Sequence, residues 1–183
     1  MIGGLPGSGK STMAKFLSTG LNFTVLDKDT IANPMTERML EISGRSRDDR
    51  ESDFYLNNIR DIEYETMMDI AFENISLGVD VVCCAPFGKE FKSEDWINAV
   101  TEKVLSLNAV VSFIVLKSDL VTIHKRILLR KETRDTWKLN NWSEYIESAV
   151  SGELDYSKKL KIVENNKEPM CVSVQFINIA NKM

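Results

Sequence analysis

Gly4-Leu5-Pro6-Gly7-Ser8-Gly9-Lys10-Ser11 stands almost at the start of the chain and matches the pattern G-x-x-x-x-G-K-[S/T]. In a chain of this length and average composition, such a match arises by chance in under roughly 1% of cases. Glycines let the backbone bend so that N–H groups point inward at phosphate oxygens, and a helical pattern begins at Lys10. We therefore predict a phosphate-binding loop whose nucleotide-binding residues are Gly4, Pro6, Gly7, Ser8, Gly9, Lys10, Ser11 and Thr12.

Two side chains of this loop have predicted chemical roles. Lys10 would bridge the β- and γ-phosphates of a nucleoside triphosphate, and the Ser11 hydroxyl would be a ligand of Mg²⁺. Such a loop should follow a buried strand of about five apolar residues, yet only Met1, Ile2 and Gly3 precede it. Either the first strand is very short, or the chain begins later than its relatives do.

Outward from the loop, short β-like runs alternate with longer helical patterns. Strands are predicted at 23–26, 79–85, 109–116 and 171–179, and helices at 11–20, 35–42, about 54–77, 94–106, 120–131 and from 143 onward. Strands separated by helices imply right-handed β-α-β units. We therefore expect one domain over 1–183, a three-layer α/β fold with a parallel sheet of about five strands, the first of them short.

The composition narrows the class of protein. The 183 residues carry 23 basic and 27 acidic side chains, a net charge of −4, and 43% are hydrophobic, which is ordinary for a soluble domain. No apolar run approaches a membrane span, and no signal peptide precedes the loop. The odd count of three cysteines predicts reduced thiols and a cytoplasmic location. The mild acidity argues weakly against a nucleic-acid partner.

Two carboxylates after the second predicted strand suggest phosphoryl transfer. The chain contains neither D-x-x-G nor N-K-x-D, as a GTPase would, and no apolar strand ends in Asp-Glu, as in an ATP-driven motor. Asp27 and Asp29 instead stand where the carboxyl ends of parallel strands converge on a ligand. We favour Asp29 as the base that accepts a proton from a substrate hydroxyl, with Asp27 as the second candidate. The alternative is that Asp29 or Thr30 only caps the following helix.

A stripe of arginines predicts a lid over about 126–142. Arg126, Arg130 and Arg134 recur at a spacing of four, on one side of a helix. In a small kinase, Arg130 and Arg134 would neutralise the charge that develops during transfer. The alternative is a solvated helix face with Glu132 and Asp135 as partners.

Together, the loop through Thr12, Leu26-Asp27-Lys28-Asp29 and Arg130-x-x-x-Arg134 resemble the P-loop kinase families around phage polynucleotide kinase and the zeta toxins. The middle of the chain is similar to bacterial ATP-binding proteins of the AAA type. The resemblance implies ATP as phosphate donor, Mg²⁺ as cofactor and Asp29 as base. One departure is Cys84, which stands before Ala85-Pro86-Phe87 where this family would place an Asp, so that metal binding or catalysis would be weakened.

The sequence signal for the acceptor-binding site is less specific than the motif of the phosphate-binding loop. Arg60, Glu63 and Tyr64 lie at i, i+3 and i+4 of the long predicted helix and are, with Asp27, candidates for substrate binding, although Tyr64 alternatively only packs. The sequence thus predicts a small ATP-dependent kinase that transfers the γ-phosphate to a hydroxyl of an unidentified acceptor. The alternatives are an ATP-binding or ATP-hydrolysing regulatory protein without kinase activity, and a polynucleotide 5′-hydroxyl kinase.

Overall fold

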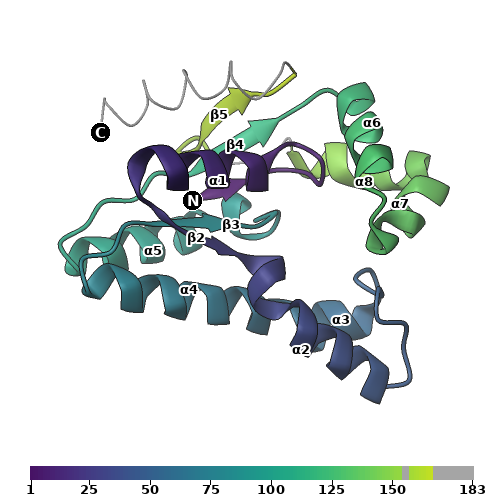
Figure 1. Cartoon of the computed structure of the whole chain (residues 1–183), viewed down its shortest axis with the longest axis horizontal. Coiled ribbons are helices and arrows are strands. Elements are labelled where there is room, and N and C mark those ends of the chain that lie inside the picture. The colour runs from purple at the N-terminus through teal and green to yellow at the C-terminus, as the bar shows by residue number, and fades with distance from the viewer. Residues whose placement is uncertain (154–156, 167–183) are drawn as a thin grey trace.

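A five-stranded parallel sheet forms the centre of the computed structural model, which describes residues 1–153 and 157–166 (Figure 1). The strand order is β2-β3-β1-β4-β5. The strands are β1 (Ile2–Gly3), β2 (Thr24–Asp27), β3 (Val81–Cys84), β4 (Ile114–Lys117) and β5 (Lys161–Glu164). Because every described pair is parallel, the carboxyl ends of all five strands meet at one edge of the sheet.

Helices connect the strands and cover both faces of the sheet. They are α1 (Lys10–Leu21), α2 (Lys28–Ile42), α3 (Asp53–Asn58), α4 (Arg60–Ser76), η1 (Glu90–Lys92), α5 (Glu94–Ser106), α6 (Leu120–Arg130), η2 (Thr133–Asp135), α7 (Thr136–Asn140) and α8 (Trp142–Glu153). Local sequence sets several of their starts, because the side chains of Asp27, Ser52, Ser93 and Asp119 accept backbone hydrogen bonds as N-caps of α2, α3, α5 and α6.

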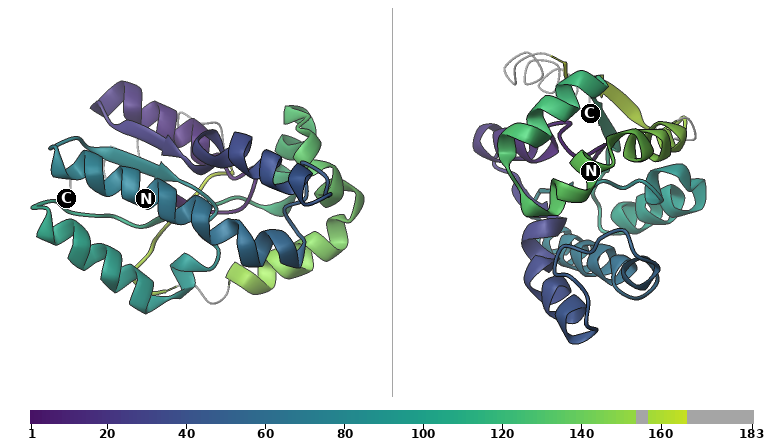
Figure 2. Two further views of the ribbon diagram at one scale, coloured as in Figure 1. Left: turned by 90° about the horizontal axis from the view of Figure 1, so that it is seen from below. Right: turned by 90° about the vertical axis from the view of Figure 1, so that its right-hand side faces the viewer.

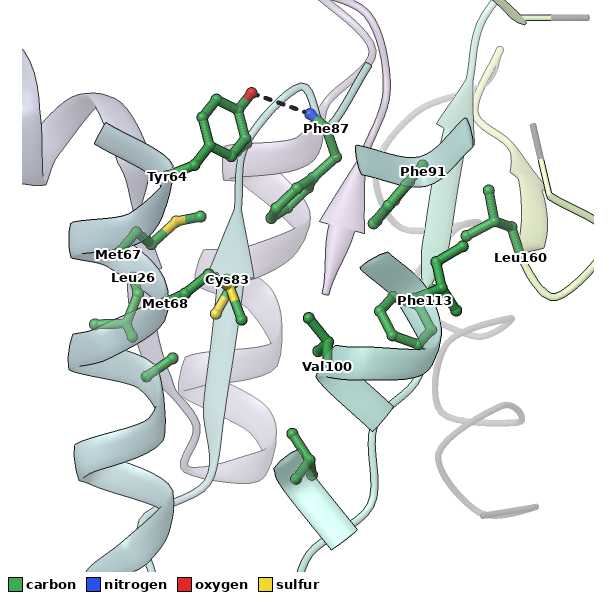
Figure 3. Packing of buried hydrophobic residues seen from close by; sticks show 14 of the residues in the cluster. Leu26, Tyr64, Met67, Met68, Cys83, Phe87, Phe91, Val100, Phe113 and Leu160 are labelled. Atoms are coloured by element: carbon green, nitrogen blue, oxygen red, sulfur yellow. Dashed lines mark hydrogen bonds between the residues drawn. The ribbon is translucent and has the colours of Figure 1, made fainter. Parts of the chain in front are cut away.

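Two apolar clusters lie on opposite faces of the sheet. The ribbon views in Figure 2 show the helices that flank the sheet. Met13, Ala14 and Leu17 of α1 pack on one face against Ile2, Cys84 and their neighbours. Residues of α4 and α5 cover the other face, where the fully buried rings of Phe87 and Phe91 stack with centroids 4.8 Å apart (Figure 3). The fold is therefore the three-layer α/β arrangement that the sequence predicts.

The strand after α8 differs from the prediction. The fifth strand is β5, Lys161–Glu164, which pairs with β4 and which sequence patterning missed. Its alternation is weak, because only Val163 is buried within it. The strand predicted at 171–179 lies outside the described residues, so the single-domain organisation over 1–183 stays a prediction.

Other element boundaries shift for local reasons. The two-residue β1 confirms a very short first strand. The helix predicted at 35–42 already begins at Lys28, because Asp27 caps it, and Pro34 lies inside α2. The helix predicted over about 54–77 is interrupted at Ile59, whose buried side chain packs with Leu40 and Tyr55. The strand predicted at 109–116 enters the ladder only at Ile114.

A mostly apolar cavity lies apart from the phosphate-binding loop. Its volume is about 630 Å³, and its walls are mostly apolar side chains at the amino ends of the strands, including Leu17, Met68, Val82 and Val104. None of residues 4–12 lines it.

Within the described part of the chain, no helix has the length and hydrophobicity that crossing a membrane requires.

Candidate active site

The loop between β1 and α1 has the backbone conformation that its glycines predict. Gly4, Gly7 and Gly9 all have positive φ, of 132°, 81° and 98°. A Cβ atom at Gly4 would lie 2.3 Å from the Leu116 carbonyl oxygen, and one at Gly9 would lie 2.4 Å from Asn165 Nδ2. Both positions therefore need glycine for conformation and for space.

Groups outside the loop hold two of its carbonyls. Asn165 Nδ2, just after β5, donates to the Ser8 carbonyl at 2.7 Å, and Arg126 Nη1 of α6 donates to the Gly7 carbonyl at 3.3 Å. Ser118 links the two, because its Oγ donates to the Asn165 carbonyl at 2.7 Å and accepts from Arg126 at 3.0 Å. In a trans peptide the C=O and the following N–H point in opposite directions. Because Asn165 holds the Ser8 carbonyl from outside the loop, the N–H of Gly9 points into the loop.

Asn165 and Ser118 are functional candidates that the sequence analysis missed. The available signal was the polar pair Asn165-Asn166, separated by one residue from the short run Leu160–Val163. The sequence analysis placed the last strand at 171–179 instead. Ser8 Oγ and Asn165 Oδ1 are also buried without a hydrogen-bond partner in the described structure. Buried polar atoms without a partner usually mark a place for water or ligand. Ser8 Oγ and Asn165 Oδ1 can therefore still form hydrogen bonds.

Lys10 lies at the centre of the charged groups. Its Nζ donates to the Leu5 carbonyl at 3.0 Å, within its own loop. Burial lowers the pKa of Lys10; Cys84, Asp29 and Asp27 oppose this shift, and Arg130 adds to it. The predicted residues Lys10, Asp29 and Arg130 are therefore close enough to interact electrostatically.

Ser11 and Asp27 form the candidate metal corner. Ser11 Oγ donates to Asp27 Oδ2 at 2.9 Å, while Asp27 Oδ1 accepts the N–H groups of Asp29 and Thr30. Asp27, and not Asp29 or Thr30, is thus the N-cap of α2. A hydroxyl and a carboxylate suit the hard ion Mg²⁺. In the described residues no three His, Cys, Asp or Glu side chains gather as a metal group, so nucleotide phosphates would have to complete the coordination.

Cys84 lies beside this corner. Its Sγ is 3.8 Å from Ser11 Oγ, and the residue pairs with Asp27 across the β2–β3 ladder. Burial raises the pKa of the Cys84 thiol to about 12, against the effect of Lys10, so that the thiol is neutral.

Glu63 accepts three hydrogen bonds in the interior. Lys28 Nζ and Thr36 Oγ1 each lie 2.5 Å from its carboxylate oxygens, and Tyr55 Oη lies at 2.8 Å. These donors come from α2 and α3, so the buried acid of α4 joins three helices. Lys28 also pairs with Asp29 at 3.2 Å, and the Asp29 side chain remains 38% exposed.

Arg60 and Tyr64 also have internal partners. Arg60 binds both carboxylate oxygens of Glu90, at 2.8 and 3.0 Å, and its guanidinium lies 4.3 Å from the centroid of the Tyr64 ring. Tyr64 Oη accepts the Phe87 N–H at 3.2 Å. The structure thus brings Arg60, Glu63 and Tyr64 to one region, where each stabilises the fold. Their role in acceptor binding stays a prediction.

The lid region begins with an oriented arginine. Arg130 donates through Nε and Nη2 to Asp135, at 2.5 and 2.6 Å, and Asp135 is 1% exposed. The sequence analysis named Asp135 only as a partner on a solvated helix face. In the structure Asp135 is buried and fixes the Arg130 guanidinium, whose charge acts on Lys10. The backbone of Arg134 lies in η2, and its side chain lies outside the described part of the structure.

Residues of the predicted lid contact the polar connector between α2 and α3. Lys138 Nζ lies 3.2 Å from Glu51 Oε1, and Thr133 Oγ1 donates to Asp48 at 3.4 Å. Arg126, in contrast, donates to the Gly7 carbonyl of the phosphate-binding loop. The first residue of the predicted lid therefore stabilises that loop.

Replacing Asn165 by Leu keeps the branched shape of the side chain, with bulkier methyl groups, and removes the amide that holds Ser8. We expect ATP to bind about tenfold more weakly, because one hydrogen bond contributes about 1 kcal/mol and the loop loses its orientation. Calorimetric titration measures this. Asn166→Ala is the control, since Asn166 contacts Asp119 and not the loop. Unchanged affinity in folded Asn165→Leu protein would contradict the positioning role.

Glu63→Gln keeps the shape and removes the charge that faces Lys28. We expect the free energy of unfolding to fall by about 3 kcal/mol, the lower end of the range for a broken buried pair, because Asp29 still faces Lys28. Urea denaturation measures this, with exposed Glu65→Gln of the same helix as control. Unchanged stability with an increased KM for an acceptor would instead assign Glu63 to substrate binding.

Comparisons with known proteins identify the family and the fold. A family model described as an AAA domain matches residues 1–149. No curated protein matches the sequence. Solved structures that share the fold include three kinases. Shikimate kinase from Aquifex aeolicus is 18% identical and covers 99% of this chain and 95% of its own, with a TM-score of 0.55.

The other two are similar at comparable levels. The APS kinase of Mycobacterium tuberculosis in complex with AMPPNP and APS is 15% identical over 98% of this chain and 93% of its own, with a TM-score of 0.55. A gluconokinase from Sinorhizobium meliloti is 12% identical over 99% and 94%, with a TM-score of 0.52. The family match and the shared architecture lead to one conclusion: the chain belongs to the AAA-domain family, with the fold of the P-loop kinases.

Proposed function

We propose that the protein is an ATP-dependent kinase that transfers the γ-phosphate to a hydroxyl of a small molecule, with Mg²⁺ as cofactor. The observation that carries this proposal is the set of charges around Lys10. The cation Arg130 and the carboxylates Asp29 and Asp27 all act on the ammonium at the end of the phosphate-binding loop. A phosphoryl-transfer site needs these groups together: cations for the phosphates and a carboxylate for the acceptor proton.

Each residue has a defined task in this reaction. The loop N–H groups and Lys10 bind the β- and γ-phosphates, and Arg130, oriented by Asp135, neutralises charge on the transferred group. Ser11 and Asp27 would hold Mg²⁺, which when bound offsets phosphate charge. The acceptor oxygen attacks the γ-phosphorus, the bond to the bridging oxygen of ADP breaks, and the hydroxyl proton goes to Asp29.

The proposal of a small-molecule acceptor rests on the net charge of the protein and on the names of kinases that share its fold. The net charge of −4, with Arg45 and Arg47 of the connector paired to Asp49 and Glu37, argues against a polynucleotide. The names of three proteins with this fold, shikimate kinase, APS kinase and gluconokinase, support a small acceptor.

The free, buried thiols of Cys83 and Cys84 support a cytoplasmic location.

One observation favours a second candidate, an ATP-binding or ATP-hydrolysing regulatory protein without transfer. Arg60, Glu63 and Tyr64, the predicted acceptor residues, are engaged in internal contacts. Screening a metabolite pool for new phosphorylated products, with ATP and Mg²⁺, separates the two candidates.

Lys10→Ala removes the charge that would bridge the β- and γ-phosphates. We expect loss of ATP binding in calorimetry or loss of turnover, with the fold retained, because Lys10 makes only one described hydrogen bond, to its own loop. Lys15→Ala, on the exposed side of α1, is the matched control and should bind ATP as the wild type does. Undiminished binding and turnover in folded Lys10→Ala protein would overturn the assignment of the loop.

Asp29→Asn keeps the size of the side chain and removes the proton acceptor. We expect ATP affinity within a few-fold of wild type and a transfer rate about 10²–10⁴ lower, the usual contribution of general acid–base catalysis. Asp27→Asn is measured beside it, because Asn retains N-cap function. A normal rate for Asp29→Asn with a collapsed rate for Asp27→Asn would move the base to Asp27. Normal transfer rates in both would exclude either carboxylate as the general base.

A further inference from the structure

The central strand β1 is shorter than the two strands beside it. β3 pairs with β2 through four residues, and β4 pairs with β5 through four. In contrast, β1 pairs with β3 only at Ile2 and with β4 only at Ile2 and Gly3. In the described ladder, the amino-terminal part of β3 and the residues just ahead of β4 therefore flank a gap in the sheet.

The cavity of about 630 Å³ occupies this gap. Two continuous runs of backbone line it, residues 78–83 along β3 and residues 107–112 ahead of β4, and Met1 lines it too. Neighbouring strands are spaced by about 4.7–4.9 Å, so two strands on either side of a third position lie about 9–10 Å apart. The gap is therefore as wide as one extended chain.

Backbone hydrogen-bonding groups of β3 face the gap. The Ala85 N–H donates to the Ile2 carbonyl, on the β1 side. The Asp80 carbonyl accepts the Thr24 N–H, on the β2 side. Because these directions alternate along a strand, the N–H and C=O of Val81 point to the β1 side, where the described register contains no opposite residue. An extended peptide can pair with these groups, whereas a purely apolar molecule cannot.

The walls of the cavity are apolar on both faces of the sheet. Met68 of α4 and Val100 of α5, both labelled in Figure 3, line it from one face. Leu17 and Leu21 of α1 line it from the other. Strands of a parallel sheet that are buried on both faces are continuous runs of apolar residues. The cavity therefore suits an extended segment whose successive side chains are all apolar.

The Met1 ammonium places a positive charge beside this segment's expected end. It donates to the Ser112 carbonyl at 2.6 Å, one of the three hydrogen bonds that an ammonium can donate. Burial lowers the pKa of this amino group, and Cys83 and Cys84 oppose the shift. A segment parallel to β1 would reach Met1 with its carboxyl end, so a terminal carboxylate there would pair with a buried cation.

We propose that this cavity binds the carboxyl-terminal end of a partner polypeptide as an added strand, parallel to β3 and β4, with its terminal carboxylate on the Met1 ammonium. The register sets its length: Met1 lies opposite Cys83, so residues 79–82 of β3 and its approach are available to about four apolar residues. The site is separate from the proposed kinase centre, because none of residues 4–12 lines the cavity.

The probe is the peptide Lys-Lys-Ile-Val-Ile-Val with a free carboxyl end, added to the full-length protein in calorimetry and in thermal unfolding. We expect one peptide to bind and to raise the unfolding temperature, because a ligand of the folded state stabilises that state. The same peptide as its carboxyl-terminal amide should bind at least about tenfold more weakly, because it loses a charge-assisted hydrogen bond. A version with proline at the fourth position lacks a ladder N–H and should not bind.

Two substitutions fill the cavity from opposite faces. Val104→Phe from α5 and Leu21→Trp from α1 should each weaken binding of the free-acid peptide at least about tenfold. Val121→Phe, on the exposed side of α6 and outside this cavity, is the control and should bind as the wild type does. Thermal unfolding without peptide checks that each variant is folded.

Four results would overturn the proposal. They are no binding of the free-acid peptide, equal binding of the amide or the proline peptide, wild-type affinity in both folded cavity-filling variants, and displacement of the peptide by equimolar decanoate. The last result would identify a site for acyl chains instead of an added strand. Kinase activity does not enter any of these measurements, so failure of the proposed function leaves their outcome unchanged.

Discussion

The phosphate-binding loop depends on carbonyls that are held from outside it. A loop of positive-φ glycines has many accessible conformations, and its own sequence does not select the one with N–H groups turned inward. Asn165 and Arg126 make that selection by binding the carbonyls of Ser8 and Gly7. Because these residues come from β5 and α6, the loop is correctly formed only when the far edge of the sheet is in place.

Buried charge organises the opposite side of the site. Glu63 is satisfied by three donors, and Lys28 connects it to Asp29. A buried acid with fewer partners would destabilise the protein, so the three helices around it must keep their relative positions. The position of Asp29 is therefore coupled to packing in α2, α3 and α4. Asp135 acts in the same way on Arg130, since a nearly inaccessible carboxylate leaves the guanidinium little freedom.

Sequence reasoning succeeded where a local signal sufficed. The glycine spacing around Lys10 predicted the loop, and apolar periodicity predicted the layers and the exact bounds of α5. It failed where the decisive partner was distant in sequence. Asn165 is 157 residues from Ser8, and β5 has too few buried residues to show an alternating pattern. Arg60, Glu63 and Tyr64 were recognised as a group, but their spacing could not reveal Glu90, Thr36 or Phe87 as partners.

The hydrogen bond from Lys10 to the Leu5 carbonyl has a consequence for the energetics of ligand capture. The ammonium already lies against its own loop when no ligand is present, and one of its three N–H donors binds the Leu5 carbonyl. Binding then requires a side-chain rotation, which takes picoseconds to nanoseconds, and not a refolding of backbone. Little of the interaction energy is lost to ordering the chain, so the loop behaves as a preorganised receptor.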